Sequence, residues 1–126
     1  MERKVITTAT APQSSAPLSQ AIQVGNFLYV SGQVGVNPRT GEIPTGIEAQ
    51  TRQTLENMQA VLEAAGSSLE KVVKATVFLT DMQQFAQMNA VYKTFFPQNP
   101  PARSCVGVSA LARPEFVVEI ECIAVL

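Results

Sequence analysis

Two segments near the end of the chain carry the side chains best suited to chemistry. Residues 103–108 and 116–125 alternate β-branched and other residues with a period of two, which is typical of β-strands. Because successive strand side chains point to opposite sides, we predict one apolar face and one mixed face. The mixed face carries a guanidinium, a thiol and two carboxylates: Arg103, Cys105, Glu119 and Glu121. An isolated buried charge is very costly, so these charges need partners, and they mark the candidate site.

Arg103 and Glu119 allow two interpretations, because the pattern places them on the same face. A structural ion pair bridging subunits is the more common arrangement for such residues, and a catalytic pair is the alternative. Glu121 fits an interface or surface salt bridge better than a part in a reaction. Cys105 fits a small lining residue better than a nucleophile, because the sequence offers no base to activate its thiol.

The composition argues against several classes of function. The chain has no histidine, which removes histidine acid–base catalysis, Ser-His and Cys-His nucleophiles, and the commonest metal ligand. Its net charge is −1 and its nine basic residues form no run, unlike the basic patches of nucleic-acid binders. No apolar stretch approaches the roughly 20 residues of a membrane span, and the N-terminus leads into no signal-peptide core. We therefore expect a cytoplasmic protein with reduced thiols at Cys105 and Cys122, which we assign to opposite faces of the sheet.

The size and charge content of the chain suggest one small domain that associates with copies of itself. At 126 residues the chain is expected to form a single domain spanning 1–126. Only 15% of its residues are charged, against about 25% in typical domains, and 46% are hydrophobic. We expect other copies of the chain to cover part of this poorly charged surface.

Local patterns predict two helices. The first runs from a capping box of Thr45 and Glu48 to Gly66, which suits the left-handed position after a helix. The second begins after Asp81, with Gln84 as the partner of that cap, and ends before the prolines that precede Arg103. The remaining strands are predicted at residues 4–8, 21–24, 27–31 and 72–80.

Two polar features stand out against these patterns. Asn89 lies on the apolar stripe of the second helix, where it must find hydrogen bonds; neighbouring backbone and a bound ligand are equally good partners. Ser31 and Gly32 end a hairpin strand. A glycine there either lets the backbone approach a ligand closely or simply ends the strand.

The order of elements predicts an α+β two-layer sandwich with one mixed six-stranded sheet. Right-handed crossovers place both helices on the same face of that sheet. The other face is then uncovered, yet it is too apolar to remain in water. Its predicted residues are Val72, Phe78, Val117, Ile123 and Val125, beside Arg103 and Glu119. Association through this face would bring the charged pair to or near a subunit interface.

The segments Pro101–Cys105 and Val118–Val125 together resemble the signature of the reactive intermediate deaminase (RidA/YjgF) family. The likeness extends over nearly the whole chain and rests on many segments in the right order: residues 16–21, 31–33, the turn at 37–41, Asn57, 64–66, Lys74, 76–77, Phe85 and Asn89. The resemblance implies a chorismate-mutase-like fold and a homotrimer with active sites in clefts between subunits. It also implies hydrolysis of 2-imino and 2-enamino acids to 2-keto acids and ammonia, without metal or organic cofactor.

Such a substrate gives the candidate residues defined roles. Arg103 would bind the substrate carboxylate through two parallel charge-assisted hydrogen bonds, which lysine cannot reproduce. Glu119 would orient or deprotonate the attacking water. The resemblance adds a substrate-binding set that lines the pocket: Ser31, Gly32, Asn89, Cys105 and Leu18.

Leu18 is a departure from the family pattern, which has tyrosine at this position. Leucine cannot donate a hydrogen bond, so the change points to a pocket adapted to a more apolar ligand. It also favours the first alternative function, a non-catalytic trimeric module that binds ligands or acts like a chaperone. The second alternative, a ribonuclease-type translation inhibitor, is disfavoured by the acidic balance and the missing histidine.

Overall fold

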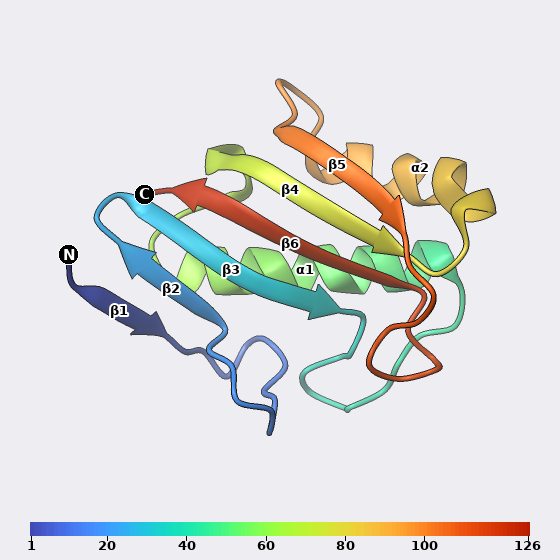
Figure 1. The fold of residues 1–126 in the computed structure, drawn as a ribbon, viewed down its shortest axis with the longest axis horizontal. Helices are drawn as coiled ribbons and strands as arrows, with labels where there is room; N and C mark the ends of the chain where they lie inside the picture. The colour runs from blue at the N-terminus through green and yellow to red at the C-terminus, as the bar shows by residue number, and fades with distance from the viewer.

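The computed structural model describes residues 1–126 as one six-stranded sheet with two helices packed on one of its faces (Figure 1). The strands are β1 (Arg3–Ile6), β2 (Ala21–Val24), β3 (Phe27–Val34), β4 (Val72–Leu79), β5 (Ala102–Gly107) and β6 (Val118–Val125). The helices are α1 (Ile47–Ala64) and α2 (Phe85–Phe95), with short 3-10 turns η1 (Leu69–Lys71) and η2 (Met82–Gln84). The predicted α+β two-layer sandwich with a mixed sheet is confirmed.

The sheet order puts the last strand of the chain near the middle. The strands run β1-β2-β3-β6-β4-β5, and only β4 and β5 are parallel. Parallel neighbours need a long crossover, which α2 supplies between β4 and β5. As a result Glu119 lies on a central strand, whereas Arg103 lies on the edge strand β5.

The core lies between the sheet and the helices. The apolar face predicted for β6 is buried there, and Val118, Ile120 and Ala124 are fully buried. Ala75, Val77 and Leu79 of β4 belong to the same buried cluster, as do Leu55 and Met58 of α1. The other face of the sheet has no helix and exposes large apolar side chains, among them Val5, Phe27 and Tyr29.

The helix ends differ from the prediction at their N-termini. The expected capping box is wrong, because Gly46 with a φ of 97° occupies the N-cap of α1 and no side chain caps it. Gly66, with a φ of 85°, follows the end of α1 as predicted. The Asp81 carboxylate accepts a hydrogen bond from the Gln83 amide at 3.0 Å, so it caps η2 and not α2 itself.

Two predictions about sheet faces are wrong because they depend on how the strands pair, which alternation within one strand does not determine. Val72 lies in the core, since a bulge between Val72 and Lys74 shifts the register against β6. The two cysteines do not lie on opposite faces: Ala75 is the partner of Cys122, and Val77 is the partner of both Cys105 and Ile120. Both thiols therefore lie on the helix-covered face, as free cysteines separated by β4.

No helix of the structure combines the length and the apolar character that a membrane crossing requires.

Candidate functional site

Arg103 projects from β5 toward α2. Its Nη1 donates a hydrogen bond to Oδ1 of Asn89 at 2.7 Å. The guanidinium carbon lies 4.7 Å from the centre of the Tyr92 ring and 5.6 Å from that of Phe85, within the range of cation–π attraction. The Asn89 side chain therefore finds its hydrogen-bond partner in the Arg103 side chain, and not in the neighbouring backbone or a bound ligand, the two partners considered from the sequence. One nitrogen of the guanidinium is thereby fixed, and its other donors stay available.

Cys105 follows on the same face of β5 and packs against the core while remaining partly exposed. Its burial raises the thiol pKa, and the nearby Arg103 charge opposes that effect without cancelling it. The thiol is thus kept protonated at neutral pH, as expected of a lining residue and unlike an activated nucleophile. Arg103, Asn89 and Cys105 form the first half of the candidate site, here called the arginine group.

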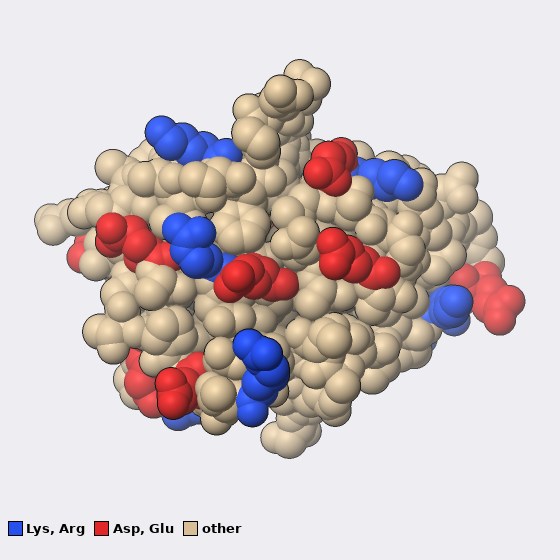
Figure 2. Space-filling model, turned by 180° about the vertical axis from the view of Figure 1, so that it is seen from behind, with Lys and Arg blue, Asp and Glu red and all other residues tan.

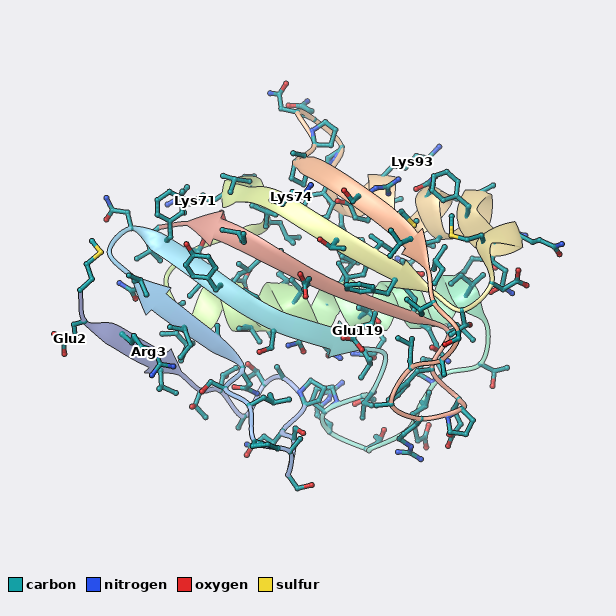
Figure 3. All side chains as sticks on the ribbon, in the orientation of Figure 1. Glu2, Arg3, Lys71, Lys74, Lys93 and Glu119 are labelled. Atoms are coloured by element: carbon teal, nitrogen blue, oxygen red, sulfur yellow. The ribbon has the colours of Figure 1, made fainter.

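Glu119 projects from the opposite face of the sheet. It pairs with Val34 of β3 and Phe78 of β4, and Figure 3 shows it near the end of β3. A Cβ added at Gly32 would overlap Oε2 of Glu119, so only glycine leaves room for the carboxylate in this position. Burial, and secondarily the neighbouring charge of Glu121, raise the pKa of Glu119. No salt bridge reaches its carboxylate, because the chain's one ion pair joins Arg113 and Glu115.

Leu18 and Ser31 lie beside Glu119 and Gly32. The Ser31 hydroxyl donates to the Ser19 carbonyl at 2.6 Å, which ties the end of the loop between β1 and β2 (residues 7–20) to β3. Leu18, in that loop, is 53% exposed. A cavity of about 580 Å³ is lined by Leu18, Gly32 and Glu119 together with residues of three neighbouring loops. Leu18, Ser31, Gly32 and Glu119 form the second half of the candidate site, here called the glutamate group.

The prediction that Arg103 and Glu119 share a face is wrong. On β4, which lies between their strands, Arg103 is aligned with Ala75 and Glu119 with Phe78. Positions three apart on a strand point to opposite sides, so the two charged side chains lie on opposite faces of the sheet. They form no ion pair within one chain.

Sequence reasoning missed three buried side-chain amides that fix the loops around the cavity. Gln50 lies on α1 and is only 2% exposed. Its Nε2 donates to the carbonyls of Glu115 and Pro44, and its Oε1 accepts from the Val117 amide. Such long-range partners leave no local signal in the sequence. Gln20 and Asn57 hold other loops in the same way.

Charge is distributed without a dominant patch on the helix-covered face. Figure 2 shows acidic and basic side chains interspersed there among neutral residues. No group of three His, Cys, Asp or Glu side chains is arranged to hold a metal ion.

Comparison with known proteins gives consistent matches over almost the whole chain. Residues 8–126 match the family model described as endoribonuclease L-PSP. The chain is 46% identical to the 2-iminobutanoate/2-iminopropanoate deaminase of Escherichia coli over 97% of both proteins. It is 52% identical to a RutC family protein of Pyrococcus horikoshii, again over 97% of both.

Solved structures agree with the sequence comparisons. The structure of Escherichia coli TdcF with bound serine shares 44% identity and a TM-score of 0.93, with 98% of each chain covered. RidA from an Antarctic Psychrobacter shares 45% identity and a TM-score of 0.94, covering 98% of this chain and 99% of that one.

Proposed function

Because the chain belongs to the endoribonuclease L-PSP family, among whose members are RidA proteins, we propose that it is a hydrolytic deaminase. Its substrates would be reactive 2-imino acids and their 2-enamino tautomers, and its products 2-keto acids and ammonia. The observation that carries the proposal is the environment of two side chains. Arg103 is held in position by Asn89 and two aromatic rings. Glu119 has a raised pKa, forms no ion pair and lies against Gly32.

Arg103 would hold the substrate by its carboxylate. A guanidinium carries five N–H donors, and Asn89 occupies one of them through Nη1. The remaining donors include an adjacent pair that matches the two oxygens of a carboxylate. The Tyr92 and Phe85 rings lie close to the guanidinium and limit its motion. The Arg103 side chain therefore loses little conformational entropy when the substrate binds.

Glu119 would act as the general base and general acid of the hydrolysis. A water oxygen attacks the imine carbon while Glu119 removes its proton, and the C=N electron pair moves to nitrogen, which is protonated. The resulting carbinolamine then breaks its C–N bond as nitrogen takes a further proton and leaves as ammonia, and loss of the hydroxyl proton gives the keto group. A carboxyl with a raised pKa accepts and returns a proton more readily near neutral pH than an ordinary glutamate does.

The two groups would meet between copies of the chain. They lie on opposite faces of one sheet, and one of these faces exposes Phe27 and Tyr29 with no cover from the chain itself. These facts support a closed ring, which we propose to be a homotrimer, in which the arginine group of one subunit faces the glutamate group of the next. Analytical ultracentrifugation tests the assembly, and a monomer at micromolar concentration would contradict it.

The family description also names a ribonuclease, but the residues of this chain support that activity poorly. The chain has no histidine and a net charge of −1, and the helix-covered face carries no basic patch. RNA incubated with the pure protein is expected to remain intact.

The direct test of the proposed function is turnover of a reactive enamine. 2-Aminoacrylate generated in situ should be converted to pyruvate faster when the pure protein is present. Glu119→Gln should lose this acceleration while keeping its fold, as judged by circular dichroism. An unchanged rate of pyruvate formation with wild-type protein would refute the deaminase proposal.

A further inference from the structure

The cavity beside Glu119 is larger than the smallest imino acids require. It measures about 580 Å³, and the carboxylate of Glu119 and the backbone of Gly32 form part of its lining. Away from them the lining includes the apolar side chains of Leu18, Val36 and Phe116, contributed by three separate loops. A substrate with its imine carbon at Glu119 would therefore have apolar space for a side chain much longer than a methyl group.

The walls of this cavity are held in place before any ligand arrives. Gln20 bonds to the carbonyls of Thr8 and Pro12 in the loop that carries Leu18. Asn57 donates to the carbonyls on either side of Gly35, those of Val34 and Val36, at 2.9 Å each. Gln50 bonds to the backbone on both sides of Phe116. Each wall is thus fixed by a buried neutral amide, as expected of a preformed binding site.

The cavity has no unpaired cation that could bind a substrate with a charged side chain in addition to its carboxylate. Among its lining residues only Glu119 and Arg113 are ionisable. The Arg113 guanidinium is already paired with Glu115 at 2.9 Å, outside the lining. An acidic substrate side chain would meet no free cation there, and it would lie near the Glu119 carboxylate.

We propose that this cavity binds the substrate side chain and that the protein prefers 2-imino acids with apolar side chains of about four carbons, such as the imine of leucine, over 2-iminopropanoate. This inference rests on the proposed function for the identity of the reacting group. Leu18 supports the preference, because it adds apolar surface where a tyrosine would add a hydroxyl. Each further methylene group that is buried strengthens binding about fourfold. Three further carbons should therefore raise kcat/KM at least tenfold.

The experiment compares imines made in situ from L-leucine, L-alanine and L-glutamate by an L-amino-acid oxidase with catalase. Hydrolysis is followed by the loss of semicarbazone formation. We expect kcat/KM for the leucine imine to exceed that for the alanine imine at least tenfold, with the glutamate imine lowest. Ala112→Phe, which fills part of the cavity, should bring the leucine-to-alanine ratio toward one. Ala110→Phe, in the same exposed loop but outside the lining, should keep the wild-type ratio.

A binding measurement separates this inference from the proposed function. Calorimetry with 4-methyl-2-oxopentanoate and with pyruvate needs no turnover, and the first should bind at least tenfold more tightly, with the advantage lost in Ala112→Phe. Equal or reversed preference in both assays, with the alanine imine readily hydrolysed, overturns the side-chain pocket and leaves the deaminase intact. Preferential binding without hydrolysis of any imine supports the pocket and overturns the deaminase.

Discussion

A site shared between subunits predicts that two inactive variants restore activity when they assemble together. Arg103→Ala removes the arginine group's carboxylate anchor, and Glu119→Gln removes the proton acceptor of the glutamate group. Each homotrimer should be inactive, because every cleft would lack one of the two side chains. In a mixed ring, a cleft works only where a Glu119→Gln subunit supplies Arg103 and an Arg103→Ala subunit supplies Glu119.

The size of the recovery follows from the geometry. A mixed trimer has two subunits of one variant and one of the other, and it contains three clefts. Only one of these clefts has both wild-type side chains, and this holds whichever variant contributes two subunits. Co-expression with two different affinity tags and tandem purification isolates only such mixed rings. Their kcat for pyruvate formation from 2-aminoacrylate should be about one third of the wild-type value.

The control is a double variant carrying both substitutions in one chain, co-expressed with wild-type protein. A mixed ring with two wild-type subunits then retains one complete cleft, and a ring with one wild-type subunit retains none. If mixed rings of the two single variants show no activity above the homotrimers, the proposal that the two groups meet between copies is refuted. Activity in either homotrimer would refute the assigned roles themselves.

Three further predictions test single residues. Arg103→Lys keeps the charge but loses the planar fork, so kcat/KM should fall roughly 10- to 100-fold in the pyruvate assay while sedimentation still shows the assembled protein. Gln50→Leu leaves three part-buried backbone groups without their side-chain partners and should lower the free energy of unfolding by about 2–5 kcal/mol in urea titrations. Gln59→Leu, at a partly exposed position of the same helix, should change it little. The raised pKa of Glu119 means that the folded state holds this proton more tightly than the unfolded chain. Stability should therefore decline as pH rises from the unfolded-state pKa of Glu119 to its raised folded value, and Glu119→Gln should abolish this dependence.

The sequence was informative wherever the signal was local. Alternation along β6 identified its buried face correctly, and local signals identified the helix that the structure shows as α1. Gly66 marked the end of that helix because a residue with positive φ is needed there. Each of these inferences depends only on residues within a few positions of one another.

The sequence was misleading wherever the answer depended on pairing between strands. Alternation fixes which residues of one strand share a face, but it does not relate the faces of two strands separated by a third. Arg103 and Glu119 were therefore placed together although β4 sets them on opposite sides. The bulge at Val72 and the bonds of Gln50 to a loop 65 positions away are long-range in the same sense.

The opposite placement of the two groups also constrains the assembly that could use them. A twofold interface applies the same patch of both subunits to each other, so one flat contact of this kind cannot include both faces of the sheet. Joining the arginine group of one copy to the glutamate group of the next is a head-to-tail contact, which either closes into a ring or grows into a filament. The uncovered face, with Val5, Phe27 and Tyr29 exposed, favours closure because a ring can bury this apolar surface in every subunit. Catalysis and ring closure would then depend on the same contacts, and any substitution that opens the ring should abolish activity even when each chain remains folded.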